Sequence, residues 1–347
     1  MKVGIAGIGF MGMIHYLSYD KLDGVDVVAL AEPNAKRLGG DWTDIKGNFG
    51  PQGEMMDLSG IATYADAGAM IAESDVDFVD VCLPPGMHAA VAIEALQAGK
   101  HVFCEKPIAL TTDDGQRMVA AAEAADRLLM IGHVLPFLPE YRKACELIES
   151  GNYGRVLGGH FTRVIDDPQW LANYWDADKI GGPMLDLHVH DAHFIRLVFG
   201  MPTSVTSVGR MRGELAEYWN TQFRFENRDL VVTATSGVIN QHGRTFMHGC
   251  EIHLEEATIG FEFAVIGDQP ELLLPLTILT PDGGTERPDL GGGDPMLRAF
   301  EAELAEVARS VASGTPSPIL GGNLARDAVV LCHKQTESIQ TAGPVAT

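Results

Sequence analysis

Two polar residues four apart, Asp186 and His190, follow a Gly181-Gly182-Pro183 turn in a stretch with helical character. Residues at this spacing lie on one face of a helix, so both side chains can reach one small molecule. A histidine titrates near neutral pH and can take a hydroxyl proton, and an adjacent carboxylate can orient its ring. A third group, Lys106, follows an apolar run and could stabilise a developing alkoxide. Such residues suit the oxidation of an alcohol.

A second pattern near residue 1 predicts where an oxidant would bind. An apolar strand from Lys2 runs directly into a G-x-G-x-x-G motif. The first glycine allows a tight turn, the second allows a pyrophosphate to approach the backbone, and the third allows a helix to pack on the sheet. Glu32 follows at the end of the next expected strand, where its carboxylate can bind the adenosine ribose diol and so favours NAD over NADP. The expected cofactor-binding residues here are Gly7, Gly9, Phe10, Met11, Gly12 and Glu32.

Alternating strands and helices over the first 130 residues predict a doubly wound parallel sheet. After a helix at 139–150 the pattern changes to strands joined by short turns, which predicts an open, mostly antiparallel sheet with helices. We therefore expect an NAD-binding domain at 1–133 and a substrate-binding and oligomerisation domain at 134–347. The strands expected in the second domain are 156–165, 205–212, 221–225, 230–239, 251–265 and 272–280, and its further helices are 183–199, 295–312 and 323–341.

Three segments together resemble the Gfo/Idh/MocA family of NAD(P)-dependent oxidoreductases across essentially the whole chain. They are the glycine motif, Glu105-Lys106-Pro107, and the segment from Gly181 to His190, with Leu83-Pro84-Pro85-Gly86-Met87-His88 in support. The resemblance implies that Lys106, Asp186 and His190 are catalytic and line the substrate site beside the nicotinamide. It also implies an open sheet used in oligomerisation, and hence a homodimer or homotetramer. The remaining expected contacts are Pro84, His88, Glu105 and Lys106 for the cofactor, and His133 and Trp175 with the catalytic residues for the substrate.

The chain departs from the family pattern at positions that bear on the substrate. Gly86 stands where members commonly have asparagine, and Pro136 stands where an arginine often contacts substrate. His193 replaces a common aspartate, so Asp186, His190 and His193 could instead bind a divalent metal. A neutral His193 hydrogen-bonded to its neighbours explains the same residues without a metal, and we expect none.

Composition excludes several classes of partner. The 347 residues carry a formal net charge of −22, which repels nucleic acids. No stretch is apolar for long enough to span a membrane, and a strand starting at residue 2 leaves no room for a signal peptide, so we expect a cytoplasmic protein. The five cysteines lack metal-binding or redox spacing.

The sequence therefore predicts an NAD-dependent dehydrogenase acting on a secondary hydroxyl of a sugar, sugar derivative or cyclitol. Two alternatives stay open: a lyase or glycosidase that oxidises its substrate transiently with retained NAD, and a non-catalytic nucleotide-dependent regulator. Release of NADH during turnover distinguishes the dehydrogenase from the lyase or glycosidase. The complete set of Lys106, Asp186 and His190 argues against the non-catalytic regulator.

Overall fold

The computed structural model describes residues 1–347, which divide into two compact units. The first comprises Met1–Leu138 with Gly292–Arg326, and the second comprises Pro139–Gly291 with Asp327–Thr347. Both units therefore use residues from the last third of the chain. Residues 292–326 thus pack with the first unit although they follow most of the second unit in the sequence.

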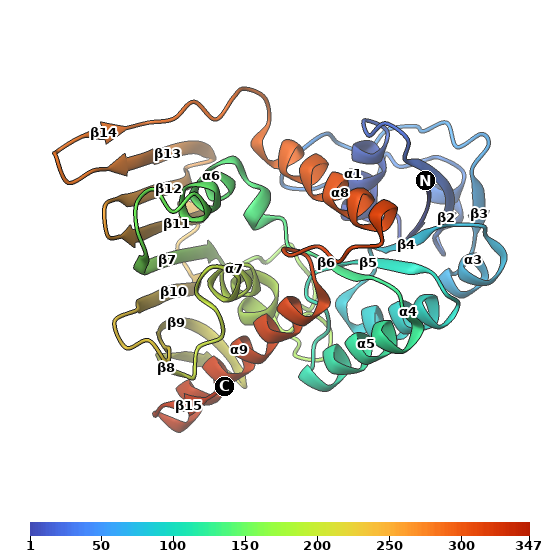
Figure 1. Cartoon of the computed structure of the whole chain (residues 1–347). Helices are drawn as coiled ribbons and strands as arrows, with labels where there is room; N and C mark the ends of the chain where they lie inside the picture. Colours follow the sequence, from blue (N-terminus) through green and yellow to red (C-terminus); the bar gives the residue numbers. More distant parts are fainter. The chain divides into compact units, whose positions relative to one another are not determined.

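The first unit contains a six-stranded parallel sheet in the order β3-β2-β1-β4-β5-β6, with helices around it (Figure 1). The order reverses between β1 and β4, and in open α/β sheets ligands bind at the carboxyl ends of the strands at such a switch point. This confirms the expected doubly wound sheet. Its strands are β1 (Lys2–Ala6), β2 (Asp26–Ala31), β3 (Ala62–Tyr64), β4 (Phe78–Val81), β5 (His101–Glu105) and β6 (Leu129–Gly132), and its helices are α1 (Phe10–Tyr19), α2 (Ala35–Leu38), α3 (Ala67–Glu73), α4 (Pro85–Gln97), α5 (Thr112–Ala125) and α8 (Pro295–Ser313).

Helix α8 joins the first unit because its apolar face packs against α1. The ring of Phe300 stacks on Phe49, with 5.5 Å between the ring centroids, and lies 5.9 Å from the His15 ring of α1. An amphipathic pattern predicts that a helix has a buried face but does not say which core that face joins.

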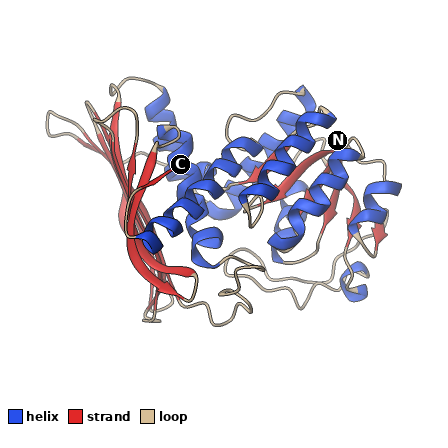
Figure 2. Cartoon of the chain, turned by 90° about the horizontal axis from the view of Figure 1, so that it is seen from below, coloured by secondary structure: helices blue, strands red, loops and turns tan.

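The second unit is a nine-stranded sheet, β14-β13-β12-β11-β7-β10-β9-β8-β15, with helices on one face (Figures 1 and 2). Only β7 and β10 pair in parallel, which confirms the mostly antiparallel sheet. Its strands are β7 (Val156–Asp166), β8 (Ser204–Arg212), β9 (Leu215–Arg224), β10 (Val231–Ile239), β11 (Arg244–Leu254), β12 (Thr258–Ile266), β13 (Gln269–Leu279), β14 (Thr285–Glu286) and β15 (Val345–Ala346), and its helices are α6 (Pro139–Glu149), α7 (Val189–Phe199) and most of α9 (Gly322–Thr341).

Two expected strands differ from those observed. The expected strand 251–265 belongs to the two antiparallel strands β11 and β12, because Leu254 N–H bonds to the Ala257 carbonyl in a tight turn that contains Glu255 and Glu256. The expected strand 221–225 is the end of a longer strand, β9. None of the helices is both long and apolar enough to cross a bilayer.

Candidate active site

The glycine motif forms a turn between β1 and α1 in which each glycine has a different environment. A Cβ on Gly7 would lie 2.6 Å from the Cys82 carbonyl oxygen, and Gly7 has a φ of +98°, which L side chains rarely adopt. A Cβ on Gly12 would lie 2.0 Å from the Gly7 carbonyl oxygen. A Cβ on Gly9 would meet nothing within 4 Å. The first and third glycines therefore serve packing, while Gly9 leaves the backbone open to a ligand.

Helix α1 begins at Phe10, directly after Gly9, and no side chain caps it. The first N–H groups of a helix have no acceptor within the helix, and they carry the positive end of its dipole. The backbone N–H groups of Phe10, Met11 and Gly12 thus suit an anion such as a pyrophosphate. The Phe10 side chain packs edge-on against Phe49, so its contribution at this turn comes from its backbone.

Glu32, at the end of β2, is buried and oriented by two backbone donors. Its Oε2 accepts the Ile8 N–H at 2.8 Å, and its Oε1 accepts the Asn34 N–H at 2.9 Å. Each carboxylate oxygen can accept a further hydrogen bond, so Glu32 can still bind a ribose diol. Arg37 lies beside it, where its Nη1 donates to the Ile8 carbonyl at 2.9 Å and its Nη2 to Asp44 at 2.9 Å.

The turns after β4 and β5 carry the other expected cofactor residues. Pro84 is exposed and precedes α4. His88 is fully buried, with Nδ1 2.8 Å from the Pro107 carbonyl oxygen and Nε2 2.7 Å from that of Leu83. His88 thus ties the two turns together. Lys106 is half-buried, and its backbone N–H donates to Glu105 Oε2 at 3.0 Å.

In the second unit, Asp186 lies in a π-helical turn, Met184–His188, that continues into α7 at Val189. Such turns are rare in proteins overall, and many of those that occur lie at functional sites. Within residues 181–195 every residue is buried except Asp186 and His190, which are half-buried. The segment therefore presents these two polar side chains together.

The residues around this pair are held by buried contacts. Asp191 accepts Arg163 Nε at 2.7 Å and Nη2 at 3.1 Å. His188 Nδ1 lies 2.8 Å from the Ser236 hydroxyl, and burial lowers the pKa of His188 to about 4. Both contacts anchor the π-helical turn and α7 to the sheet strands β7 and β10.

Three further residues named from the sequence have different environments. His133 and His193 are fully buried. Trp175 is half-buried; its indole N–H donates to Asp167 Oδ1 at 2.9 Å, and the Arg212 guanidinium lies 3.8 Å from its ring centroid. The Trp175 ring thus stacks on a cation, and it also packs at right angles to the Tyr174 ring, with 5.4 Å between the centroids.

Sequence reasoning missed a buried polar cluster beneath the glycine turn. His15 of α1 lies against Asp80 of β4 and Glu105 of β5. Polar residues inside otherwise apolar elements are the signal that could have found it, because a buried polar group requires a partner.

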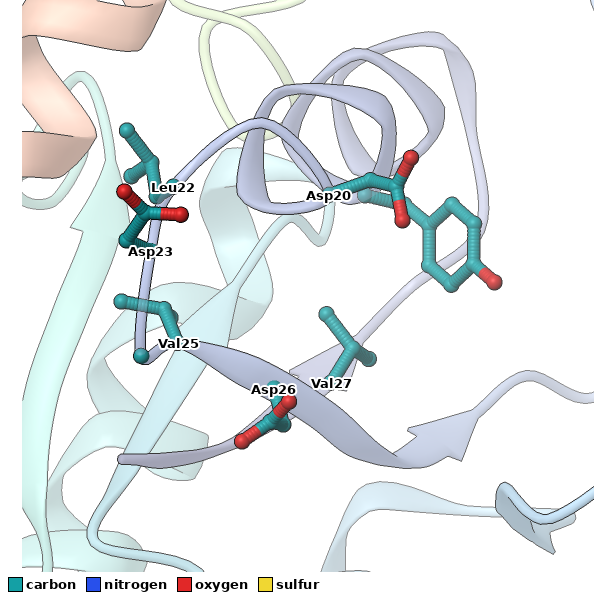
Figure 3. Close-up of a pocket in the computed structure, with 8 residues that line it drawn as sticks. Asp20, Leu22, Asp23, Val25, Asp26 and Val27 are labelled. Atoms are coloured by element: carbon teal, nitrogen blue, oxygen red, sulfur yellow. The ribbon is translucent and has the colours of Figure 1, made fainter.

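A hollow of about 310 Å³ lies elsewhere, where α1 turns into β2, and it is lined by Asp20, Asp23 and Asp26 among others (Figure 3). Asp26 begins β2, so this hollow is at the amino end of the parallel strands, opposite the glycine turn. It does not belong to the candidate site.

Two family models match the chain. Residues 1–133 match the "oxidoreductase family, NAD-binding Rossmann fold", and residues 141–260 match the "GFO/IDH/MocA C-terminal domain". The chain belongs to the GFO/IDH/MocA family. Its first 133 residues therefore form the NAD-binding Rossmann domain of that family, as the glycine motif predicts.

Curated dehydrogenases are similar to this chain at modest identity. Myo-inositol 2-dehydrogenase of Thermotoga maritima is 30% identical over 203 residues, 58% of this chain and 55% of the relative. Levoglucosan dehydrogenase of Pseudarthrobacter phenanthrenivorans is 27% identical over 295 residues, 76% of this chain and 74% of the relative. With several curated relatives, the match spans about half of their length, 53%, 55% and 47% in three cases.

Among solved structures, levoglucosan dehydrogenase in complex with NADH and levoglucosan aligns with a TM-score of 0.79 at 23% identity, covering 100% of this chain and 99% of that one. A probable dehydrogenase from Thermotoga maritima aligns with a TM-score of 0.79 at 22% identity, covering 100% and 98%. These similarities establish the shared fold.

Proposed function

We propose that this GFO/IDH/MocA member is an NAD-dependent dehydrogenase that oxidises a secondary hydroxyl of a sugar, sugar derivative or cyclitol. The observation that carries the proposal is the half-buried, partly accessible pair Asp186 and His190 in an otherwise buried segment. An inositol dehydrogenase and a levoglucosan dehydrogenase among the relatives support a polyol substrate.

Bound NAD would supply a hydride acceptor. His190 takes the proton of the substrate hydroxyl, and Asp186 orients the substrate or the imidazole ring through hydrogen bonds. The Lys106 ammonium stabilises negative charge on the hydroxyl oxygen as that proton leaves. His133 and Trp175 are proposed substrate contacts. The helix-free face of the nine-stranded sheet is the proposed surface for a homodimer or homotetramer.

The test is a panel of sugars and cyclitols, with NADH formation followed by absorbance. We expect Lys106→Ala to lower turnover by about 100-fold or more while NAD binding stays near wild type. Lys100→Ala is a matched control, since Lys100 precedes β5, Lys106 follows it, and both are half-buried.

The outcomes separate the alternatives. Sustained NADH release that requires Lys106 supports the dehydrogenase. Turnover without added NAD or NADH release would indicate a lyase or glycosidase with retained cofactor. NAD binding with no turnover on any panel member would indicate a regulator.

A further inference from the structure

The buried cluster around His15 bridges the core of the first unit to the Lys106 turn. His15 is fully buried on α1, with Nδ1 2.9 Å from Asp80 Oδ2 and Nε2 3.2 Å from Glu105 Oε1. The imidazole ring therefore lies between two carboxyl groups, with a hydrogen bond to Asp80 of β4 and a contact at ion-pair distance, without hydrogen-bond geometry, to Glu105 of β5. Tyr19, one turn further along α1, donates its hydroxyl to the same Asp80 oxygen at 2.9 Å.

Glu105 connects this cluster to the backbone of Lys106. One oxygen of Glu105 faces His15, and the other accepts the Lys106 backbone N–H at 3.0 Å. The space for the carboxyl group is closely defined, since a Cβ on Gly132 would lie 3.2 Å from Glu105 Oε1. A change in the direction of the Glu105 side chain would therefore move the backbone from which the Lys106 side chain extends.

The charge balance of the cluster favours a protonated His15. Burial lowers the pKa of His15, but Cys82 and Asp80 together outweigh burial and raise it well above its ordinary value. Burial, and then the charge of Glu105, raise the pKa of Glu303 well above the usual range, which favours the uncharged form of this carboxyl group. The groups that face His15 are Tyr19 from α1, Asp80 and Cys82 from β4 and the turn after it, Phe103 and Glu105 from β5, and Phe300 and Glu303 from α8.

We propose that His15 is a positioning residue, which bridges Asp80 and Glu105 and thereby fixes the Lys106 turn in the orientation that catalysis requires. The proposal rests on the proposed function, because it gives His15 its effect through Lys106. A misplacement of about 1 Å can lower an enzymatic rate by about 100-fold, so a bridge of this kind can matter without touching substrate.

The first experiment requires no substrate. The full-length protein is labelled with ¹⁵N-histidine, and the His15 resonances are assigned by their loss in His15→Asn. We expect the His15 ring to lose its second proton at a higher pH than a solvated histidine does, and Glu105→Gln to shift this deprotonation to lower pH. A His15 ring that is neutral at pH 7, or whose titration ignores Glu105→Gln, would overturn the proposal.

The same NMR experiment also tests whether a metal ion binds in the cluster. The ligand-type atoms of His15, Asp80 and Cys82 lie within 4.8 Å of one another, but they are already hydrogen-bonded together. Stoichiometric zinc in the purified protein, with a His15 nitrogen shift that changes on chelation, would replace the proposed bridge by a metal site.

The second experiment is a double-mutant cycle of His15→Asn and Lys106→Ala. We expect His15→Asn to lower kcat by about 10- to 100-fold in the wild type and less than about 2-fold beside Lys106→Ala, with the NAD dissociation constant within about 3-fold of wild type. If His15→Asn does not fold, Glu105→Gln takes its place in the cycle. His248→Asn is the matched control, since His248 is a buried imidazole of the second unit whose effect should be independent of Lys106.

The outcomes separate two failures. If Lys106→Ala keeps normal turnover, the proposed role of Lys106 fails, and the positioning role fails with it. If Lys106→Ala is impaired but His15→Asn has the same fold effect in both backgrounds, the proposed function stands and His15 is only structural.

Discussion

The glycine turn predicts opposite effects of the same substitution at two positions. Gly9→Ala places a methyl group where nothing lies within 4 Å, at φ −88° and ψ −162°, which alanine can adopt. Gly12→Ala places a methyl group 2.0 Å from a backbone oxygen of Gly7. The methyl group added at Gly9 can contact only a bound ligand, whereas the methyl group added at Gly12 clashes with the protein backbone.

The magnitudes follow from these environments. Gly9→Ala restricts the unfolded chain without strain in the folded one, so the free energy of unfolding should rise by about 0.4–1 kcal/mol. Because its methyl group projects toward the expected pyrophosphate, NAD affinity should fall at least about tenfold, or about 1.4 kcal/mol. Gly12→Ala should lower the free energy of unfolding by about 1–3 kcal/mol despite the better helix propensity of alanine.

Urea unfolding without cofactor measures the free energy of unfolding, and calorimetric titration with NAD measures the NAD affinity. Gly243→Ala is the control, because Gly243 also has nothing within 4 Å of a Cβ but lies in the second unit. It should leave NAD affinity unchanged. The reasoning is refuted if Gly9→Ala binds NAD as the wild type does, or if Gly12→Ala is as stable as the wild type.

Three further predictions concern single polar groups. NAD should be preferred over NADP because the Glu32 carboxylate repels a 2′-phosphate. Asp44→Ala should reduce this preference, because it frees the Arg37 guanidinium to bind the 2′-phosphate. Equal catalytic efficiencies for both cofactors in the wild type would contradict the prediction. His190→Ala should abolish substrate oxidation and, with it, the increase in oxidation rate as pH rises. His193→Ala should lower the rate less, and chelators should leave the wild-type rate unchanged. Activity lost on chelation and restored by zinc would instead support a metal at Asp186, His190 and His193. The pKa of Glu303 is raised in the folded state, so the wild type loses stability as pH rises above about 4.5, the ordinary pKa of the unfolded chain. Glu303→Gln should therefore be more stable than the wild type at pH 8, with a smaller gain at pH 5. Equal gains in the free energy of unfolding by urea at both pH values would rule this out.

The sequence was informative about the first sheet because each βα unit carries several local signals. Strand hydropathy, the glycine turn and Glu32 all depend on residues near one another, and Glu32 lies where expected, at the end of β2. The helix at 183–199 was also expected, but its start as a π-helical turn was not, because one extra residue in a turn leaves no mark on hydropathy.

Long-range pairings were harder to predict. The Trp175 ring was expected to face a sugar, yet the sequence gives no sign that Arg212, 37 positions later, covers one face. Likewise, Asp80 interrupts a buried strand, but the histidine that pairs with it lies 65 positions earlier. Residue type predicts that a buried charge needs a partner, while only the fold selects which one.

The NAD-binding unit has a further consequence for synthesis on the ribosome. Its last helix, α8, begins at Pro295, after the residues 139–291 of the other unit have already emerged. Until then the face of α1 that carries His15, together with Phe49, lacks the Phe300 ring that packs on both. The unit that is encoded first is therefore completed late, and a fragment ending at residue 138 would expose an apolar surface that promotes aggregation. An isolated NAD-binding unit would need residues 292–326 supplied through an engineered linker.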